Sequence, residues 1–391
     1  MMNLPAPSTL VPATSEDAAH MRAALALAAR GLGSTWPNPS VGCVIVRDGQ
    51  VVGRGWTAPG GRPHAETEAL KRAGSNATGS TAYVTLEPCC HWGRTPPCTD
   101  ALIDAGIARV VVALRDPDPR VDGAGLERMA AAGIAITMGV LEEEARALNQ
   151  GFLKRLSENL PLVTLKLATT LDGRIATRTG ESQWITGPAA RRAAHVLRGR
   201  HDAVLVGSGT VVADDPELSC RIPGFAPIPT VRIVADARLR TNPAARMLRE
   251  GGPVWVATRP GHSDASLGVL RAAGAIILEV PGAEEGAGLD LPSLLRALAA
   301  RGLTRVLAEG GAALAAGLLR NGLVDQLAWF HAPAIMGGDG RPAADALPLE
   351  LLASMPRYRR IGVSMVGADL LSEFVSTAPS ASKAPSPRRL A

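Results

Sequence analysis

The sequence is short of aromatic residues and of long apolar runs, and each shortage excludes a class of protein. Phe, Trp and Tyr make up only 3% of the 391 residues, so few side chains are available to stack on nucleic-acid bases. The net charge of +5 is mild for this length. We therefore expect a phosphorylated small molecule as the partner, and no nucleic acid. No apolar run of about 18 residues occurs, which predicts that no helix crosses a membrane.

Cysteines are also few, and they indicate the compartment. Five cysteines are too few, and odd in number, for a disulfide framework. The N-terminal stretch MMNLPAPSTLVPATSED lacks the basic start and apolar block of a secretory signal. We therefore expect a cytoplasmic protein whose thiols are reduced.

What the sequence does contain is enough apolar material for two domains. Hydrophobic residues make up 46% of the chain, and a length of 391 residues predicts two or three domains. Residues 1–15 and 376–391 are rich in Pro, Ser and Ala, which predicts a disordered lead-in and a disordered tail. A charged amphipathic helix over 141–156 is followed by Pro161, where we place the boundary. The predicted domains are therefore 16–156 and 161–375.

Strands alternate with helices in both halves, which favours mostly parallel sheets and an α/β fold class. In the first half Ser15 is a plausible helix cap, Gly31 ends that helix, and Asp48-Gly49 predicts a hairpin. Other helices are expected over 64–73 and 98–105 and from Pro188. Strands are expected over 41–46, 51–55, 81–86, 109–114, 133–140, 162–170, 203–207, 231–236, 254–258, 275–280 and 304–309.

One group of residues in the first half is typical of a zinc site. His64 and Glu66 are followed by Cys89 and Cys98. One imidazole and two thiolates leave a tetrahedral zinc with an open fourth position for water, whose pKa the metal lowers towards ~7. Glu66, two residues from His64, is placed to carry protons without being a ligand. This is the layout of the zinc nucleobase deaminases.

Two other interpretations of these cysteines remain open at the level of sequence. Cys89, Cys90 and Cys98 are buried thiols in one, and in the other a closed structural zinc site also uses Cys90. The eight residues between Cys89 and Cys98 also depart from the usual P-C-x-x-C, because Trp92 stands three residues after Cys89. We interpret Cys43 as a core cysteine and Cys220 as a core or loop cysteine.

The segments PNPSVGCVIV, HAE and VTLEPCCHWGRTPPC resemble the deaminase domain of the bifunctional riboflavin-biosynthesis deaminase/reductase family. That resemblance implies a cytidine-deaminase-like three-layer domain, with zinc on His64, Cys89 and Cys98 and with Glu66 as proton shuttle. It also places Asn38 on the pyrimidine edge, although a turn asparagine between two prolines is the alternative. Arg94 is a further candidate, for the substrate phosphate or as a surface charge.

The segments LKLATTLDGRIA, GESQWITG, LVGSGTVVADDPELSCR and AEGGAALAAGLL resemble the reductase domain of the same family, which is dihydrofolate-reductase-like. From the residues alone the case is weaker. The run from Gly207 to Val212 is not a Rossmann fingerprint, because Val stands at its sixth position. Gly310-Gly311, between a strand and a helix, suits either a pyrophosphate at a helix N-terminus or a tight packing turn.

The resemblance implies two sets of contacts in this half. Two arginines suit a ribose phosphate, because guanidinium offers phosphate a rigid fork of donors. The implied NADPH contacts are Ala168, Trp184, Thr210, Asp214, Asp236 and the loop Gly311, Ala312, Ala313, Leu314, Ala315, Ala316, Gly317. The implied substrate contacts are Ser182, Arg198, Leu218, Arg221 and Glu309.

Three of these assignments have alternatives or additions. Trp184 is also compatible with a core tryptophan, and Arg198 with a solvated basic helix face that includes Arg191, Arg192 and Arg200. Lys166 and Asp172, around the turn after the first strand of this half, are candidates to orient the sugar. No residue stands out as the proton donor of the reduction.

The predicted protein is thus a bifunctional enzyme with one zinc ion and NADPH, and its subunits are expected to associate through the reductase domain. It would deaminate 2,5-diamino-6-ribosylamino-4(3H)-pyrimidinone 5′-phosphate and then reduce its ribosyl chain. Two rivals are a nucleic-acid base deaminase and a non-catalytic zinc-stabilised binding protein. The few aromatic residues argue against the first, and the presence of Glu66 argues against the second.

Overall fold

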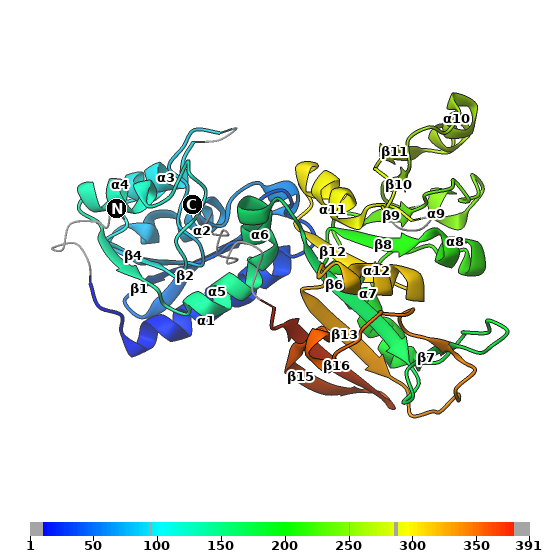
Figure 1. Ribbon diagram of the computed structural model, residues 1–391. Helices are drawn as coiled ribbons and strands as arrows, with labels where there is room; N and C mark the ends of the chain where they lie inside the picture. The colour runs from blue at the N-terminus through cyan, green and yellow to red at the C-terminus, as the bar shows by residue number, and fades with distance from the viewer. Residues whose placement is uncertain (1–10, 94–95, 250, 285–287, 379–391) are drawn as a thin grey trace, which may run out of the picture. The chain divides into compact units, whose positions relative to one another are not determined.

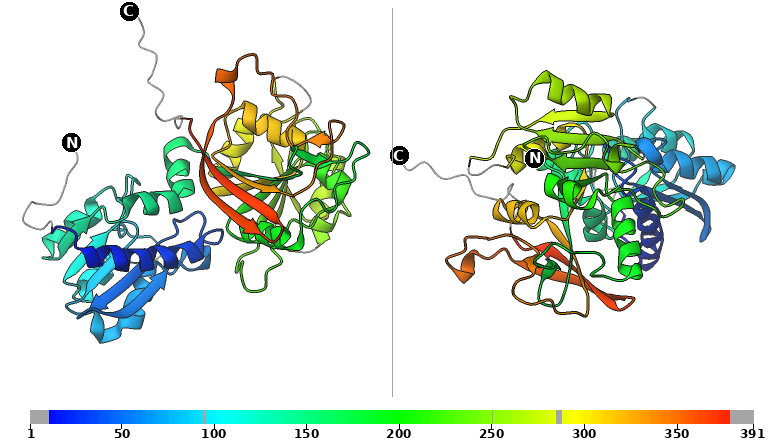
Figure 2. Two further views of the ribbon diagram at one scale, coloured as in Figure 1. Left: turned by 90° about the horizontal axis from the view of Figure 1, so that it is seen from below. Right: turned by 90° about the vertical axis from the view of Figure 1, so that its right-hand side faces the viewer.

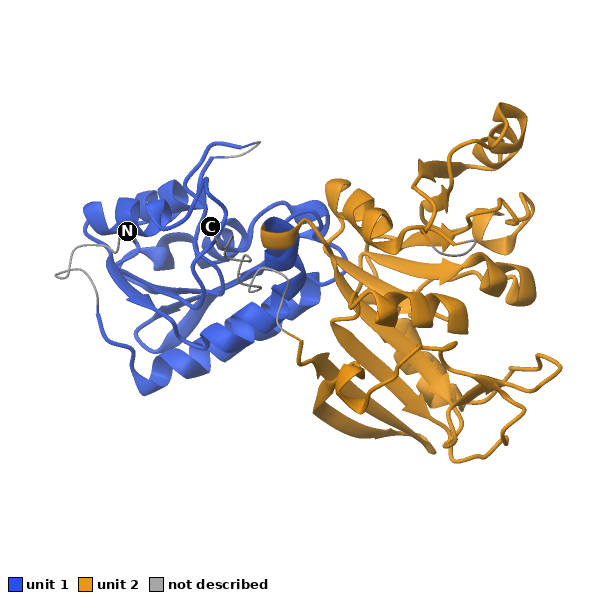
Figure 3. Ribbon diagram, in the orientation of Figure 1, with its two compact units in different colours: residues 1–156 blue, residues 157–391 orange. Residues whose placement is uncertain are grey.

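The structure, a computed structural model, describes residues 11–93, 96–249, 251–284 and 288–378. The chain divides into two compact units, Met1–Leu156 and Ser157–Ala391, which Figure 3 colours separately. Arg94 and residues 379–391 lie outside the described residues. Within the described ranges, no helix is long and apolar enough to span a bilayer.

The first unit is built on a five-stranded sheet of order β2-β1-β3-β4-β5 (Figure 1). The pairs β2–β1 and β1–β3 are antiparallel, and β3–β4 and β4–β5 are parallel. The sheet is therefore mixed, and the expectation of mostly parallel pairing is wrong for its first three strands. The strands are β1 Gly42–Arg47, β2 Gln50–Trp56, β3 Thr81–Val84, β4 Arg109–Val112 and β5 Ala135–Met138.

Helices cover both faces of this sheet, so the unit has the expected three layers. A Cβ added at Gly42 would meet the α1 backbone, and one at Gly55 would meet the α2 backbone. Gly55 pairs with Cys43, the residue next to Gly42, and neighbouring strand residues point to opposite faces. The helices are α1 Ser15–Ala28, α2 Ala65–Ala73, α3 Cys98–Asp104, α4 Ala124–Ala131, α5 Glu142–Leu148 and α6 Gln150–Glu158.

Residues 11–15, the described part of the predicted lead-in, make specific contacts. The Val11 amide donates to the Ile136 carbonyl at 2.8 Å. The cap of α1 is Thr14, not Ser15, because Thr14 and Asp17 form a reciprocal capping box. The predicted helix 141–156 is in fact the two helices α5 and α6.

Asp17 also joins α1 to the sheet. Its buried carboxylate accepts two hydrogen bonds from Arg109 at 2.9 and 2.8 Å and one from the Tyr83 hydroxyl at 3.0 Å. Burial raises the pKa of Asp17, but the bonds from Arg109, Thr14 and Tyr83 outweigh it and lower that pKa to about 2. The ion pair of Asp17 and Arg109 therefore stays charged throughout the neutral pH range.

The second unit contains a nine-stranded sheet of order β11-β10-β9-β8-β12-β6-β13-β16-β15. Pairing is parallel from β11 to β13, as predicted, and antiparallel in the hairpin β16–β15, which Figure 2 shows in red at the edge of the sheet. The parallel strands are β6 Leu162–Thr169, β8 Ala203–Gly207, β9 Val231–Ala235, β10 Val254–Thr258, β11 Ala275–Glu279, β12 Arg305–Glu309 and β13 Gln326–His331.

The sequence analysis missed every strand after Glu309. These are β13, β14 Arg341–Pro342, β15 Tyr358–Val366 and β16 Asp369–Ser376, and the short β7 Arg174–Ala176 was missed as well. The helices that bear on the site are α7 Pro188–Gly199, α8 Ser208–Asp214 and α12 Ala312–Arg320. As Pro188 predicts, α7 begins at that residue.

Candidate functional site

Three predicted metal ligands converge in the first unit. His64 is the N-cap of α2, Cys98 is the first residue of α3, and Cys89 lies in the loop after β3. The Nδ1 atom of His64 lies 3.3 Å from Cys98 Sγ and 3.6 Å from Cys89 Sγ. Cys89 is not at the start of a helix. Instead the Cys98 amide, at the start of α3, points to Cys89 Sγ at 3.4 Å.

This geometry fits a zinc ion. All three ligand atoms lie within 4.8 Å of one another, and tetrahedral zinc with ordinary Zn–N and Zn–S lengths separates an N and an S ligand by about 3.6 Å. The hydrogen bonds from Cys98 and His64 lower the pKa of the Cys89 thiol to about 4. A thiolate is the form that binds a metal.

Glu66 lies beside this cluster, on the first turn of α2. It is 3% exposed, and burial raises the pKa of its carboxyl to about 7. It also lies within hydrogen-bonding reach of Cys98. A carboxyl group with a pKa near neutrality can both accept and release a proton at the working pH.

The other cysteines are not part of the group. The Cys90 thiol points to the Arg120 carbonyl at 3.5 Å, and among the described residues the ligand group contains only His64, Cys89 and Cys98. The geometry therefore favours an open three-ligand site over a closed one that uses Cys90. Cys43 is fully buried in β1. Cys220 is half-buried in the loop after α8.

Asn38 lies near the metal ligands because its loop packs against the loop that precedes His64. Its side chain lies so close to Gly61 that a Cβ at that glycine would fall 1.8 Å from Asn38 Nδ2. Gly61 has φ +83 and precedes His64 by three residues. The glycine thus lets Asn38 approach the segment that carries the first metal ligand.

The charged residues of the second unit meet at the junction of α7 with β6 and β12. Arg198 donates to both carboxylate oxygens of Glu309, at 2.6 and 2.9 Å. Lys166 is the register partner of Glu309 in the parallel pair β12–β6. Burial raises the pKa of Glu309, but Arg198 and then Lys166 outweigh it and lower that pKa to about 2. Burial lowers the pKa of Lys166.

A second group lies at the carboxyl ends of the parallel strands. Thr210 Oγ1 would be 3.2 Å from a Cβ at Gly310 and 3.3 Å from one at Gly311, and both glycines have positive φ. Asp236, which follows β9, is fully buried and bonds the Thr241 amide and hydroxyl through Oδ2, whereas its Oδ1 has no partner.

Nucleotides bind at this edge of open α/β sheets. Gly310 and Gly311, at the start of α12, have no side chains, so the phosphates of a dinucleotide could approach the backbone there. The carboxylate oxygen of Asp236 that has no partner could accept a hydrogen bond from a hydroxyl of the same ligand.

Some predicted residues lie elsewhere. The Leu218 side chain is 3% exposed and belongs to a hydrophobic core cluster, so a substrate contact at this position would be made by the backbone. Asp172 accepts hydrogen bonds from the Met336 and Gly337 amides. It therefore joins two loops, and its role differs from that of Lys166.

Trp184 is not a core tryptophan, because it is 66% exposed. The guanidinium of Arg191 lies 4.6 Å from the centre of its ring, a cation–π contact that holds it to α7. Ala168, on β6, and Ser182, two residues before Trp184, are half-buried, and Asp214 is exposed at the end of α8. The alternative of a solvated basic face for Arg198 is not supported, since its side chain is 16% exposed.

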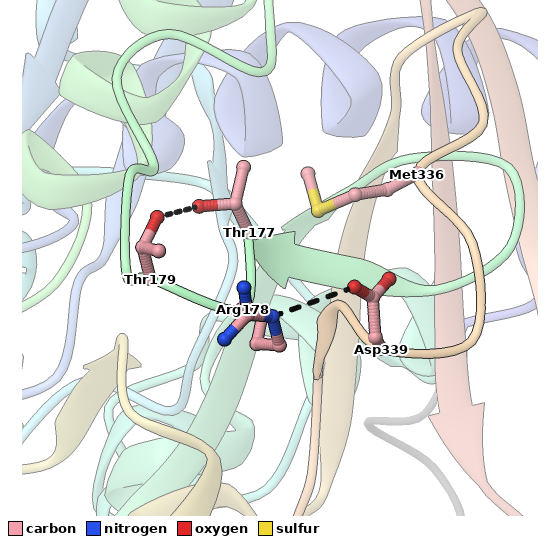
Figure 4. A pocket seen from close by; sticks show the side chains of 5 residues that line it. All are labelled: Thr177, Arg178, Thr179, Met336 and Asp339. Carbon is pink, nitrogen blue, oxygen red and sulfur yellow. Dashed lines mark hydrogen bonds and ion pairs between the residues drawn. The ribbon is translucent and has the colours of Figure 1, made fainter.

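A pocket in the second unit contains none of the predicted site residues (Figure 4). It is lined by Thr177, Arg178, Thr179, Met336 and Asp339. Thr177 and Thr179 share a hydroxyl hydrogen bond at 3.0 Å, and Arg178 lies 3.8 Å from Asp339. These side chains pair with one another, so we assign the pocket no role.

The sequence analysis overlooked His195 on α7. Its ring lies against Arg221, with both Nε and Nη2 of the guanidinium 3.3 Å from His195 Nε2. A histidine three residues before Arg198, on the same helix face, was the available signal.

Comparisons with known proteins agree with both halves. The cytidine and deoxycytidylate deaminase zinc-binding region matches residues 14–114, and the RibD C-terminal domain matches residues 161–371. The riboflavin biosynthesis protein RibD of Escherichia coli K12 is 43% identical over 371 residues, covering 92% of this chain and 99% of that protein. RibD of Aquifex aeolicus is 42% identical, with 92% and 98% covered.

Solved structures give the same result. One form of Acinetobacter baumannii RibD aligns with a TM-score of 0.83 at 40% identity, covering 93% of this chain and 99% of that one. A diaminohydroxyphosphoribosylaminopyrimidine deaminase/5-amino-6-(5-phosphoribosylamino)uracil reductase of Thermotoga maritima aligns with a TM-score of 0.80 at 34% identity, covering 92% and 98%.

Fold and site together define a zinc-type deaminase joined to an α/β reductase. The chain belongs to the RibD family of riboflavin biosynthesis proteins. It is a bifunctional hydrolase and oxidoreductase that uses zinc in the deaminase and NADPH in the reductase. The fold class, the two activities and the two cofactors predicted from the sequence are thereby confirmed.

Proposed function

We propose that the first unit replaces the 2-amino group of 2,5-diamino-6-ribosylamino-4(3H)-pyrimidinone 5′-phosphate by oxygen. His64, Cys89 and Cys98 hold the zinc, and the observation that carries this assignment is the 3.3 and 3.6 Å separation of their ligand atoms beside Glu66. Bound zinc supplies an activated water. A carbon–oxygen bond forms at C2, the bond from C2 to the exocyclic nitrogen breaks, and ammonia leaves.

Glu66 moves the protons of this reaction. Its carboxylate accepts a proton from the attacking water and delivers protons to the ring nitrogen and to the leaving amine. The raised pKa, about 7, suits both directions of transfer. Asn38, packed against Gly61, presents an amide donor and acceptor to the pyrimidine edge.

In the second unit we propose that Ala168, Trp184, Thr210, Asp214, Asp236 and residues 311–317 would hold NADPH, which would supply a hydride to C1′ of the protonated open-chain imine of the ribosylamine and become NADP⁺. The product carries a ribityl chain. Arg221 binds the substrate phosphate, with Arg198 beside it. Lys166 and Glu309 offer the sugar hydroxyls a donor and an acceptor, since they lie side by side in register. Ser182 and the backbone of Leu218 complete the substrate contacts.

Replacement of Glu66 tests the separation of the two activities. The variant Glu66→Gln keeps the size of the side chain and removes its basic oxygen, so we expect ammonia release to fall by about 10²–10⁴-fold. NADPH oxidation with the deaminated substrate should not change. The matched control is Glu68→Gln on the same helix, where the ion pair with Arg72 is exposed. Loss of both activities in Glu66→Gln would contradict two separate sites.

We further propose domain limits of 16–156 and 161–375, a cytoplasmic location and self-association through the second unit. Free cysteines and a thiolate metal site support a reducing compartment.

The edge strand β15 exposes Ile361 (53%), Val363 (53%) and Met365 (68%), which supports pairing with a second copy. Sedimentation of Val363→Lys beside the unmodified enzyme tests this, since the variant should shift to a smaller species.

A further inference from the structure

A histidine outside the predicted site residues holds one of the two proposed substrate arginines. His195 lies on α7, half-buried, one turn before Arg198. Nε and Nη2 of Arg221 each lie 3.3 Å from His195 Nε2. On the other side of the ring, Nδ1 lies 3.1 Å from the Ser219 carbonyl. The ring therefore joins α7 to the loop that carries Arg221.

The partners fix which nitrogen carries the proton. An arginine has only donors, so Nε2 must present its lone pair to Arg221. A carbonyl only accepts, so Nδ1 must donate to Ser219. Both conditions hold for the neutral ring with its proton on Nδ1 and for no other protonation state. The Arg221 amide also points at Nδ1, at 3.3 Å, and it can donate there only when Nδ1 carries no proton.

The rest of the cluster is charged at neutral pH. Glu217, in the same loop, lies 3.6 Å from Arg221 Nη1, and the hydrogen bond from Ser219 lowers its pKa. Glu309 on β12 acts on His195 through its charge, and it accepts a hydrogen bond from Arg198. On α7 itself Arg191, Arg192 and Arg198 are cations, and Asp369 of β16 bonds the Gly187 amide at the other end of that helix.

We infer that His195 is a positioning residue of the reductase: its neutral ring orients the Arg221 guanidinium for the anionic phosphate of the substrate, and protonation of the ring releases it. The inference rests on the proposed role of Arg221 in phosphate binding. The Arg221 side chain is 55% exposed, and among the described residues its guanidinium otherwise forms an ion pair only with Glu217, at 3.6 Å. Without His195 this side chain would sample several rotamers, and fixing one of them on binding costs affinity.

The charges around the ring give the direction of the pH effect. Burial, and then Arg198 and Arg221, lower the pKa of His195. The ring is therefore neutral at pH 7 and above, and it gains a proton only on the acid side of the usual histidine range. A protonated ring can no longer accept from Arg221 and repels it. Substrate affinity of the reductase should therefore fall as the pH decreases.

Steady-state kinetics of the full-length enzyme test this inference. NADPH oxidation is followed with 5-amino-6-(5-phosphoribosylamino)uracil from pH 5.5 to 8.5, with inorganic phosphate as a competing anion. His195→Leu removes the acceptor and keeps a good helix former, whereas His195→Gln retains an acceptor oxygen. Arg192→Gln, an exposed charge on the same helix, is the matched control. The thermal unfolding midpoint of each variant, measured beside that of the unmodified enzyme, reports that the variant is folded.

We expect His195→Leu to raise KM, and the inhibition constant of phosphate, about tenfold with kcat within about twofold. His195→Gln should remain within about threefold of the unmodified enzyme at pH 7.5. At acid pH the KM of the unmodified enzyme should rise for two reasons, protonation of the imidazole and protonation of the phosphate. In His195→Gln only the rise caused by the phosphate should remain. Arg192→Gln should behave as the unmodified enzyme does.

The double variant separates this inference from the proposed function. If His195 acts through Arg221, then His195→Leu adds nothing to Arg221→Gln, because the coupled residue is already absent. An unchanged KM in Arg221→Gln would overturn the role of Arg221 itself. A raised KM in Arg221→Gln together with an unchanged KM in His195→Leu, or additive effects in the double variant, would overturn the role of His195 alone.

Discussion

At the scale of single residues, the proposed reductase site depends on the carboxylate of Glu309, which lies between the cations Arg198 and Lys166. Glu309 is almost fully buried and is the only carboxylate that Arg198 contacts among the described residues, with Lys166 opposite it in register. A buried charge pair is costly to break, because removal of one partner leaves the other uncompensated. Glu309 therefore keeps the two cations in place, in addition to the proposed contact with the sugar.

The variant Glu309→Gln should consequently lose reductase activity. A neutral amide has only one acceptor oxygen, so it cannot accept both hydrogen bonds from the Arg198 guanidinium. The buried Lys166 would also lose the anion that favours its charged form. We expect kcat/KM for NADPH oxidation to fall by at least about a hundredfold, as for loss of a buried charge partner. Glu279→Gln, an exposed carboxylate at the end of β11, is the control. Near-normal reduction by Glu309→Gln would contradict the role given to this carboxylate.

The sequence could group the metal ligands because their chemistry is local. His64 and Glu66 lie on one helical turn, and the short loop before Cys98 brings it to Cys89, so a motif contains most of the geometry. The contacts of Lys166, Arg198 and Glu309 come from β6, α7 and β12. Only the assembled sheet brings such segments together, so spacing could not predict their pairing, nor that of His195 with Arg221.

At the scale of helices and strands, glycines set the distance between α2 and the sheet. A Cβ at Gly55 would lie 2.1 Å from the Ala65 carbonyl and 2.6 Å from the Ala69 amide. Both contacts are with helix backbone, which cannot move aside without moving the whole helix. Since α2 begins after His64 and carries Glu66, its position on β2 also places the metal site.

We therefore expect Gly55→Ala to damage both stability and metal binding. Overpacking of this kind costs about 1–3 kcal/mol of folding free energy, and a displaced α2 would move His64 from the two sulfurs. Thermal unfolding and the zinc content per chain measure the two effects. Gly268→Ala in α10 Asp264–Ala272 is the control, because no atom lies within 4 Å of its added Cβ. There alanine should stabilise by about 0.5–1 kcal/mol. Full zinc content in Gly55→Ala would contradict the link.

Element prediction from the sequence failed mainly at sheet edges. The strands β6, β8, β9, β10, β11 and β12 are short apolar runs between helices, and their pattern predicted them. The hairpin β15–β16 has exposed positions on both faces and a bulge at Arg360/Gly362. It therefore lacks the regular alternation that identifies a strand. The turn at Gly367, with φ +71, was the local signal that could have indicated it.

At the scale of the whole molecule, the two activities use different cofactors in different units, and this difference makes them separable by metal removal. All three proposed zinc ligands belong to Met1–Leu156, whereas the Arg198–Glu309 pair and the Gly310-Gly311 turn belong to Ser157–Ala391. Dialysis against a chelator should therefore abolish ammonia release and leave the KM and kcat of NADPH oxidation with deaminated substrate unchanged.

Metal removal should also lower the thermal midpoint of the first unit, because the ion would join the starts of α2 and α3 to the loop of Cys89. Metal analysis, both activity assays and calorimetry on the same preparation would measure this, and refilling with zinc should restore ammonia release and the midpoint together. A parallel loss of NADPH oxidation would mean that the reductase needs the metal-loaded first unit. The contribution of each unit could then no longer be assigned from its own residues.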